Sequence, residues 1–508
     1  MRYVASREEM QNIDAYSINN VGIPGIVLME KAALALEEVF LERIPTDSRV
    51  LIVTEKGNNG GDGLALGRLL LEEGYTLDFY EIGVIPHDSD SHQIQKHILE
   101  QMEADFLMKF PDEEYDVIVD AIFGVGLKRE VAGRHREVIE RLNQMEALKV
   151  AVDVPSGVDA SAGQILGIAF EADITVTFGL PKVGLLLYPG ADVSGEVIVK
   201  EIGFPNKAVE EIAPQMVSFT TDDLELLPER KAWTNKGSYG KVLLIAGSKN
   251  MAGAALLSGT AAYKSGSGLV RIFSCEENRV ILQEKLPEAI LTTYDSEEKA
   301  WELLPESLSW ASVIGIGPGI GQSAFARKLV KQVLTLGKAP LVIDADGLNN
   351  LAALLQEDTE LRQLFHEYEG GMILTPHLKE MSRLTGEEIA EIRSNLPKAA
   401  ASTADKGHVI VLKDARTIVS DGSVPSYINM SGNNGMATGG SGDVLTGIIC
   451  GFLAGGLDIL TAARLGVYCH GLAGDAAAKE KGYYSVLAGD LPNYLETILK
   501  WKHFPEEM

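Results

Sequence analysis

Cysteine and long apolar runs are both scarce in this sequence. The 508 residues include only Cys275, Cys450 and Cys469, which are too few and too scattered for a disulfide framework or a zinc site. We expect them to be small buried side chains. The N-terminal stretch lacks an apolar signal-like region, and no run of about 18 apolar residues follows. The sequence therefore predicts a cytoplasmic protein without a membrane-spanning segment.

Positive charge is also in short supply. Lys and Arg number 45 against 72 Asp and Glu, a net charge of −27, which argues against nucleic acid or an anionic membrane as a partner. A glycine turn at 57–63 is not a P-loop, because it lacks the Gly-Lys-Ser/Thr ending, and it does not match the dinucleotide fingerprint GxGxxG. If the ligands carry phosphate, local backbone groups must overcome the overall negative field.

Strand candidates alternate with helical stretches, as in parallel sheets covered by helices on both faces. The chain is long enough for about two to three domains. A polar, proline-punctuated segment at 205–228 suggests a boundary near residue 215, giving domains 1–215 and 216–508. No short-period repeat is present, so two different α/β domains are predicted. The strand candidates are 50–54, 77–82, 117–121, 149–154, 174–178 and an edge strand at 196–202, then 241–246, 268–274, 312–317, 340–344, 372–375, 408–413 and 417–420.

The most informative stretch is the glycine-rich run 433–443, which leads directly into the apolar segment 444–449. A glycine-rich turn that opens a helix presents free backbone N–H groups and the positive end of the helix dipole to an anion. Asp443 would be the one carboxylate there. Such a group is repelled by a phosphate unless it accepts a proton, for example from a hydroxyl that attacks a phosphoryl group. The alternative is an ordinary acidic residue in a first helical turn.

A second glycine turn, Gly57-Asn58-Asn59-Gly60-Gly61-Asp62-Gly63, lies between an apolar strand candidate and a helical stretch. Taken alone it is a weak signal for a phosphate site. Its asparagines and aspartate favour hydroxyl, amide or cation contacts as well. The chain therefore has two separate glycine-built sites.

Polar residues follow the strands of the first half at the sheet edge where ligands bind in α/β folds. Asn59, Asp120 and Ser156 offer the oxygen ligands that a hard cation prefers, which leaves Asp153 for proton transfer. Each aspartate could instead cap a turn. Lys182 is either a positive contact near this site or a solvated side chain.

These residues carry a resemblance to a known family. The motifs 58–63, 120–126 and 152–157 resemble the NAD(P)H-hydrate epimerase domain. The motifs Gly315-Ile316-Gly317-Pro318-Gly319, Asp344-Ala345-Asp346, 375–377, 413–417 and 439–443 resemble the ribokinase-like NAD(P)H-hydrate dehydratase. The whole chain is similar to the bifunctional NAD(P)H-hydrate repair enzymes. The resemblance implies an N-terminal Rossmann-like three-layer sandwich and a C-terminal ribokinase-like domain.

In this family, the first domain interconverts the R and S hydrates of NADH and NADPH, called NADHX and NADPHX. The resemblance implies that Asp153 contacts the reacting ring and that potassium is bound by Asn59, Asp120 and Ser156. The hydrate would be held by Asn58, Asn59, Gly60, Gly61 and Asp62, and by Gly124, Val125, Gly126, Leu127, Lys128, Arg129 and Glu130.

The second domain would dehydrate the S form at the expense of ADP with Mg²⁺, giving AMP and phosphate. Asp443 would assist attack of the ring hydroxyl on the terminal phosphoryl group. The resemblance places the hydrate against Ala254, Gly319, His377 and Asp443, and the nucleotide against Lys413, Asp414, Ala415, Arg416, Thr417 and Gly442.

Two segments depart from the family pattern. The first glycine turn is preceded by Thr54-Glu55-Lys56 where the family has Cys-Gly-x, and Leu378-Lys379 replaces Pro-Gly after His377. Because that turn loses two conformationally special residues, His377 could simply be the first residue of a helix.

Two other functions stay open. The second domain could be a small-alcohol kinase, since the same glycine run and aspartate serve phosphoryl transfer, and the first could be a non-catalytic nucleotide-binding module. The resemblance favours ADP over ATP, and a homo-oligomer is expected, although neither follows from the residues themselves.

Overall fold

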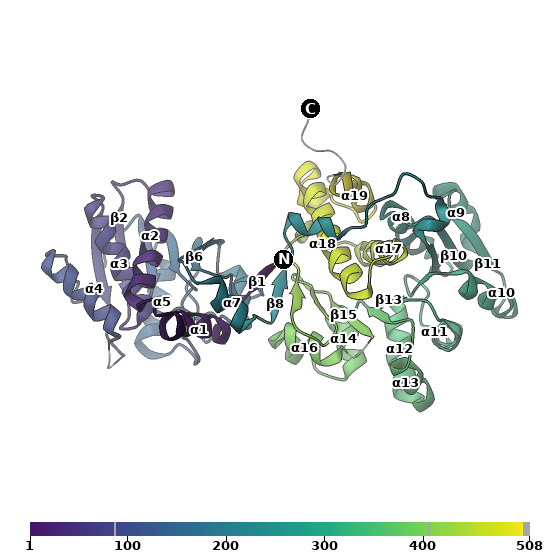
Figure 1. Ribbon diagram of the computed structural model, residues 1–508, viewed down its shortest axis with the longest axis horizontal. Helices are drawn as coiled ribbons and strands as arrows, with labels where there is room; N and C mark the ends of the chain where they lie inside the picture. Colours follow the sequence, from purple (N-terminus) through teal and green to yellow (C-terminus); the bar gives the residue numbers. More distant parts are fainter. Residues whose placement is uncertain (86–87, 405–406, 501–508) are drawn as a thin grey trace. The chain divides into compact units, whose positions relative to one another are not determined.

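The computed structural model describes residues 1–85, 88–404 and 407–500. The chain forms two compact units, Tyr3–Met216 and Val217–Met508, the second of which includes Met1–Arg2 (Figure 1). Each unit is built on a largely parallel sheet with covering helices. The prediction of two different α/β domains is confirmed. The short strands β1 (Arg2–Val4) and β8 (Met216–Ser218) occur where the chain passes from one unit to the other.

The first unit contains a six-stranded sheet in the order β3-β2-β4-β5-β6-β7. All of its neighbouring strands are parallel, so their carboxyl ends meet at one edge. The strands are β2 (Arg49–Thr54), β3 (Thr76–Glu81), β4 (Val117–Ala121), β5 (Leu148–Val152), β6 (Ile174–Phe178) and β7 (Glu196–Lys200).

Helices cover both faces of this sheet. In β2, Val50 and Ile52 enter one hydrophobic core with α2 and α3, whereas Leu51 and Val53 enter a second core with α5. Successive side chains of a strand point to opposite faces, so this apolar run is buried on both sides and the unit has three layers. The helices are α1 (Arg7–Tyr16), α2 (Gly25–Arg43), α3 (Asn58–Glu72), α4 (Asp90–Gln101), α5 (Gly133–Gln144), α6 (Val183–Leu186) and α7 (Asn206–Ile212).

The second unit has a larger sheet with the strand order β17-β16-β15-β14-β13-β12-β9-β10-β11. The strands from β15 to β11 are parallel to their neighbours, and β16 and β17 run antiparallel at the other end. The strands are β9 (Lys241–Ile245), β10 (Leu269–Cys275), β11 (Ile290–Tyr294), β12 (Val313–Ile316), β13 (Leu341–Ile343), β14 (Met372–Leu374), β15 (His408–Leu412), β16 (Ile418–Ser420) and β17 (Ser426–Ile428).

Helix α17 runs through the interior of this unit, and every residue from Val444 to Ala454 is buried. It packs closely on α8 because Gly447 has no side chain: a Cβ there would lie 2.2 Å from the Ser258 carbonyl oxygen. The helices are α8 (Ala252–Lys264), α9 (Arg279–Lys285), α10 (Glu297–Trp310), α11 (Ala324–Leu336), α12 (Asp346–Glu357), α13 (Thr359–His366), α14 (Leu378–Thr385), α15 (Ile389–Ser394), α16 (Leu396–Thr403), α17 (Ser441–Ala454), α18 (Ile459–Lys481) and α19 (Leu491–Lys500).

The strands found in the structure match those expected from the sequence to within about two residues at each end. The strand predicted at 149–154 stops at Val152 because Asp153 adopts a left-handed backbone with φ of 68°. Three-residue β17 and the edge strand β11 were not predicted. The proline-punctuated segment 205–228 contains the short helix α7.

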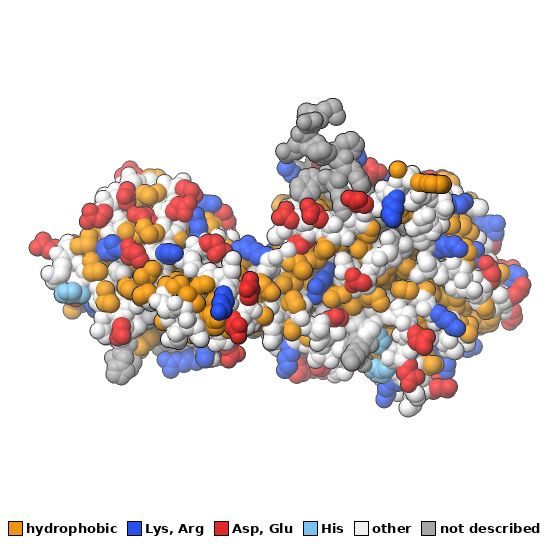
Figure 2. Space-filling view, in the orientation of Figure 1, with side chains coloured by type: hydrophobic (Ala, Val, Ile, Leu, Met, Phe, Trp, Pro, Cys, Tyr) orange, Lys and Arg blue, Asp and Glu red, His pale blue; other side chains and the backbone are white. Residues whose placement is uncertain are grey.

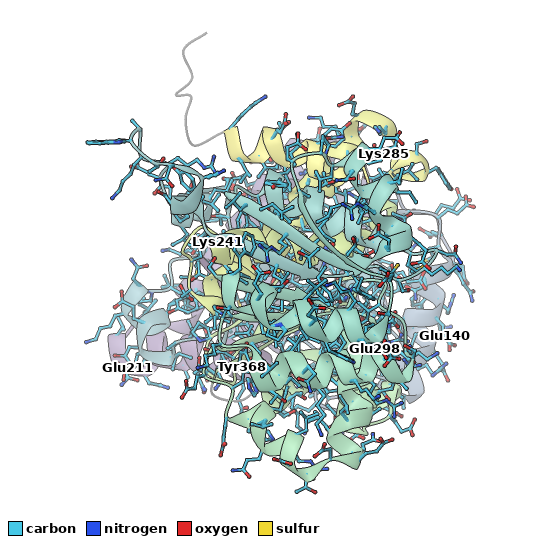
Figure 3. All side chains as sticks on the ribbon, turned by 90° about the vertical axis from the view of Figure 1, so that its right-hand side faces the viewer. Glu140, Glu211, Lys241, Lys285, Glu298 and Tyr368 are labelled. Atoms are coloured by element: carbon cyan, nitrogen blue, oxygen red, sulfur yellow. The ribbon has the colours of Figure 1, made fainter. Side chains whose placement is uncertain are left out.

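The face shown in Figure 2 mixes acidic, basic and hydrophobic side chains. Two residues labelled in Figure 3, Lys241 and Tyr368, lie at the start of β9 and shortly before β14. They mark the amino ends of the second sheet, opposite the strand ends that carry the polar residues described below. Within the described part of the chain, no helix has both the length and the apolar character needed to cross a bilayer.

We predict that Gly317→Ala destabilises the second unit by about 2 kcal/mol or more. Gly317 has φ of 130°, and a Cβ there would lie 1.8 Å from the Asp344 carbonyl oxygen. The thermal transition of this unit should fall in calorimetry. As a control, Gly253→Ala within α8 meets nothing within 4 Å and should be neutral or stabilising by up to about 1 kcal/mol. Equal transition temperatures for the two variants would contradict this account.

Candidate active sites

The first unit encloses a cavity of about 610 Å³ at the carboxyl ends of its strands. Its wall includes Asn58, Asn59 and Asp62 from the start of α3, the loop Gly124–Arg129 after β4, and Asp153 after β5. The structure thus brings these sequence-predicted residues together. Gly60, Gly61 and Glu130 do not line the cavity. Gly60 instead packs on the Glu55 carbonyl group and so lets two backbone segments approach, whereas Gly61 leaves room for the Met29 side chain.

Asp153 and Lys182 form a buried ion pair. Lys182 Nζ lies 2.7 Å from Asp153 Oδ1 and also donates to Thr177 Oγ1 and the Phe178 carbonyl oxygen, at 2.8 and 2.7 Å. The Lys182 side chain is 1% exposed, so the solvated alternative is wrong and its positive charge lies inside the site. Asp153 Oδ1 also accepts from Thr177 Oγ1 at 3.1 Å.

Two further carboxyl groups line this cavity, Asp62 and Asp14 of α1. Burial and then Asp153 raise the pKa of Asp14. Burial, followed by repulsion from Asp153 and Asp14, raises the pKa of Asp62 well above its usual range, although Lys182 opposes the shift. Asp14 precedes every motif singled out in the sequence. A single aspartate on an amphipathic helix gives no signal that it reaches a site.

Asp120 and Ser156 lie behind the cavity wall and are fully buried. Asp120 Oδ1 and Oδ2 accept from Ser156 Oγ and Ser156 N, both at 2.7 Å, and Oδ1 also accepts from Ile122 N at 3.1 Å. Burial raises the pKa of Asp120 to about 6 despite these hydrogen bonds. Asn59 has a buried Nδ2 atom without a hydrogen-bond partner among the described residues. No hydrogen bond in that part of the chain joins Asn59 to Asp120 or Ser156.

Glu55 explains how the altered turn before the first glycine run is accommodated. Its buried carboxylate accepts from the backbone N–H groups of Lys56, Val84 and Ile85 and lies 2.7 Å from His135 Nε2 of α5. Burial raises the pKa of Glu55, but the hydrogen bonds from His135 and the backbone lower it overall. The carboxylate therefore joins three segments around the turn.

The second site is the start of α17. Gly440 occupies the N-cap with φ of 95° and has no side chain to cap the helix. The first intrahelical bond runs from Val444 N to the Gly440 carbonyl oxygen at 3.1 Å. Asp443 lies in this first turn, and burial, then Asp344, raises its pKa to about 6, while Lys413 opposes the shift. The structure therefore places Asp443 at the helix start, and its role as a proton acceptor stays a prediction.

A second ion pair, between a buried aspartate and a partly buried lysine, lies beneath this helix start. Lys413 Nζ, after β15, is 2.7 Å from Asp344 Oδ1, after β13. Asp344 also accepts from Thr375 Oγ1 at 2.6 Å and Thr446 Oγ1 at 2.8 Å. Burial raises the pKa of Asp344, but Lys413 and these hydrogen bonds lower it overall. The sequence motif contained Asp344, but it was not assigned a role.

Glycines bring the other predicted residues close. A Cβ on Gly442 would lie 3.3 Å from Lys413 Nζ, and one on Gly319 would lie 2.9 Å from the Ala254 side chain. The loop that carries Asp414, Ala415, Arg416 and Thr417 follows Lys413 directly. Gly442 of α17 thus lies beside Lys413, and Gly319 lies beside Ala254 of α8, the helix that packs on α17.

His377 is the N-cap of α14. Its Nδ1 accepts from Lys379 N and Glu380 N at 3.1 and 3.2 Å, and Glu380 Oε2 accepts from His377 N in return. This capping box stabilises the turn without the family's Pro-Gly. Burial, then Lys413, lowers the pKa of His377, and burial raises the pKa of Glu380 to about 7. His377 is therefore a helix-start residue, and contact with the hydrate stays a prediction.

Comparisons with known proteins cover nearly the whole chain. A family model described as YjeF-related protein N-terminus matches residues 25–184, and one described as NAD(P)H-hydrate dehydratase matches residues 242–497. A ribokinase-like superfamily protein from Enterococcus faecalis V583 is 32% identical with a TM-score of 0.51, covering 57% of this chain and 98% of that one. This similarity supports the ribokinase-like fold of the second unit.

Three curated relatives share the name bifunctional NAD(P)H-hydrate repair enzyme. The one from Moorella thermoacetica is 38% identical, covering 98% of this chain and 97% of its own. The Thermofilum pendens relative is 35% identical, covering 98% and 96%, and the Escherichia coli K12 relative 33%, covering 94% and 90%. With two site-bearing units and full-length similarity of this kind, the chain belongs to the family of bifunctional NAD(P)H-hydrate repair enzymes.

Proposed function

We propose that each unit performs one half of NAD(P)H-hydrate repair: the first epimerises R and S hydrates, and the second dehydrates the S form. The observation that carries this division is the presence of two separate lysine–aspartate pairs, Lys182–Asp153 and Lys413–Asp344. Each pair lies beside carboxyl groups at the strand ends of its own unit, to which we assign the proton transfers. The second pair also lies beneath the glycine-rich start of α17.

In the epimerase site, Asp153 is the proton acceptor. Lys182 Nζ donates to one carboxylate oxygen, Oδ1, and so fixes the orientation of the carboxyl group. The other oxygen, Oδ2, would lie 3.3 Å from a Cβ on Gly124, a residue of the cavity wall. A carboxylate oxygen held at a fixed place beside the substrate cavity is what a general base requires. Asn58, Asn59, Asp62 and the 124–130 loop would hold the hydrate around it.

The potassium proposal is supported by the chemistry of the donor set. Asp120 has only neutral hydrogen-bond donors among its described partners, and a fully buried carboxyl group of this kind favours a nearby cation. Asn59, Asp120 and Ser156 would hold it through oxygen atoms, which hard cations prefer. Potassium would supply positive charge that keeps Asp120 ionised and fixes the loops around the cavity.

In the dehydratase site, Asp443 takes the proton of the ring hydroxyl. At the same time the hydroxyl oxygen attacks the terminal phosphoryl group of ADP. The bond to the leaving AMP breaks. Loss of phosphate and of a proton from the neighbouring ring carbon then gives NADH or NADPH. The free N–H groups at the start of α17 stabilise the transferring phosphoryl group, and phosphate leaves far more readily than hydroxide.

The nucleotide would lie against Gly442 and the loop Lys413–Thr417. Asp443 and Asp346 are carboxylates near this helix start, and the described residues offer no group of three His, Cys, Asp or Glu side chains placed to bind one metal. Mg²⁺ commonly uses one or two carboxylates together with substrate phosphates, so these residues fit an ion that arrives with the nucleotide. It would neutralise phosphate charge.

The finer points of the assignment are proposals as well: ADP as the preferred nucleotide, a cytoplasmic location and a homo-oligomeric assembly. A small-alcohol kinase is the competing function for the second unit. The mixed epimers of NADHX incubated with ADP or ATP distinguish the two. A dehydratase releases inorganic phosphate together with near-ultraviolet absorbance of NADH, whereas a kinase leaves a phosphorylated product.

We predict that Asp443→Asn retains nucleotide binding but loses dehydration. Removing a positioned proton acceptor lowers the rate by about 10² to 10⁴, while the backbone anion site at the helix start is unchanged. Phosphate release and nucleotide affinity, measured on the same preparation, check both parts. Asp222→Asn, at an exposed position of the same unit, is the matched control. Wild-type turnover by Asp443→Asn would contradict the role.

The dehydratase rate should also depend on pH through Asp443. Burial raises its pKa to about 6, and only the ionised form accepts a proton. The rate on pure S hydrate should therefore be flat above pH about 7 and fall roughly tenfold per unit below about 6. Nucleotide titration at each pH separates binding from chemistry. A rate that stays constant down to pH about 4 would rule out Asp443 as the acceptor.

Asp153→Asn should abolish epimerisation and spare the dehydratase. Asparagine tolerates the left-handed backbone and keeps an oxygen for Lys182, so the fold should survive. With an epimer mixture and excess ADP, wild type should convert all hydrate, whereas the variant should stop at the S fraction and continue only at the spontaneous rate. Loss of both activities would indicate a folding role, and full conversion at the wild-type rate would leave Lys182 as the next candidate.

A further inference from the structure

Helix α1 lies outside the family-model match of the first unit, which begins at residue 25, yet it forms part of the cavity wall. Met10, Gln11 and Asp14 of this helix line the cavity, together with Ile18 just beyond it. The site is therefore incomplete without a segment that the shared domain model does not cover.

The N-terminal segment is fastened to the loops of the site on two sides. Arg7 Nη1 donates to the Leu127 carbonyl oxygen at 3.0 Å and pairs with Asp159 at 3.3 Å, so α1 holds the loop after β4. Ala5 pairs with the segment around Lys182: its N–H donates to the Pro181 carbonyl oxygen, and its own carbonyl accepts from Val183 N. Asp14 thus enters the cavity from a fixed helix.

The charges in the cavity do not balance. Asp14, Asp62 and Asp153 face one buried ammonium group, Lys182. An ammonium group has three N–H donors, and those of Lys182 are used by Asp153, Thr177 and the Phe178 carbonyl group. Neither Asp14 nor Asp62 makes a side-chain hydrogen bond within the described residues. Lys128 and Arg129 also line the cavity but are exposed.

We propose that Asp14 and Asp62, the two carboxyl groups of the cavity wall that have no ion-pair partner among the described residues, supply the proton donor of the epimerase, while Asp153 is the acceptor. This inference rests on the proposed epimerase function and adds a catalytic residue, Asp14, to that site. Carboxyl groups that face the same cavity as Asp153 do not ionise readily, and burial together with Asp153 favours the protonated form of both.

The substrate chemistry needs both partners. Water added across an enamine double bond places the hydroxyl on the carbon bonded to nitrogen, so the hydrate is a hemiaminal. Asp153 takes the hydroxyl proton, the C=O bond forms, and the carbon–nitrogen bond breaks with its electron pair going to nitrogen. The carboxyl pair gives nitrogen a proton. Rotation about the adjacent carbon–carbon bond and the reverse proton transfers close the ring on the other face.

The test uses Asp14→Asn in the full-length chain, with Glu8→Gln on an exposed position of the same helix as control. Epimerase kcat should fall about 10²-fold with little change in KM. Because Asp62 loses a like-charged neighbour, the alkaline limb of its pH–rate profile should move to lower pH by on the order of one unit. A merely structural residue would not move that limb. Asp14→Glu should restore part of the rate.

Dehydration of pure S hydrate serves as the internal check, since that site belongs to the other unit. Absence of epimerase activity in the wild type would overturn the proposed function itself, whereas a defect specific to the role of Asp14 can be seen only in the variants. Wild-type kcat with an unshifted alkaline limb in Asp14→Asn would overturn the proposal, as would an effect confined to KM. If Asp14→Asn does not fold, Asp62→Asn provides the test. This variant should lose the alkaline limb of the pH–rate profile, and a retained alkaline limb would also overturn the proposal.

Discussion

Each site is organised around one lysine–aspartate ion pair at the carboxyl ends of parallel strands, buried in the first unit and partly buried in the second. In the first unit Lys182 after β6 reaches Asp153 after β5, and in the second Lys413 after β15 reaches Asp344 after β13, each at 2.7 Å. Burying two charges is costly, and removing one partner of such a pair typically costs about 3–5 kcal/mol. The surrounding loops must therefore supply enough hydrogen bonds to keep each pair in place.

Those hydrogen bonds tie the pairs to the groups that do the chemistry. Thr177 and the Phe178 carbonyl group hold Lys182, which holds Asp153 in a left-handed backbone conformation that aspartate tolerates. Thr446, inside α17, donates to Asp344. The second ion pair is thereby fixed to the same helix that presents Asp443, so the position of Asp443 depends on the packing of α17 against α8.

The sequence predicted much of this arrangement because its signals are local. Apolar runs of four to six residues identify buried strands, and polar residues just beyond them identify the ligand-binding edge. Asp153 stood out for that reason, whereas Asp443 stood out because it ends a glycine-rich run that opens a helix. Lys182 stayed ambiguous, since a lysine after a strand gives no indication whether its long side chain turns inward. His377 and its helix cap likewise needed the structure.

Asp14 could not be found in this way, because its contribution depends on tertiary structure. Its helix is placed by Arg7 and by the pairing of Ala5 with the Lys182 segment, and these contacts join residues more than a hundred positions apart. Sequence spacing carries no record of such contacts. Short strands such as β17 were missed for a related reason, since three residues give too little periodicity to distinguish a strand from a turn.

The balance of charge in each site connects the structure to proton chemistry. In a chain with a net charge of −27, each site places one lysine in contact with one aspartate, beside further carboxyl groups. Those further carboxyl groups are destabilised as anions. Burial and repulsion raise the pKa of Asp443 to about 6 and that of Asp62 well above its usual range. A carboxyl group with a pKa of about 6 exchanges protons near neutral pH, whereas a second lysine beside Asp443 would keep it ionised and remove that ability.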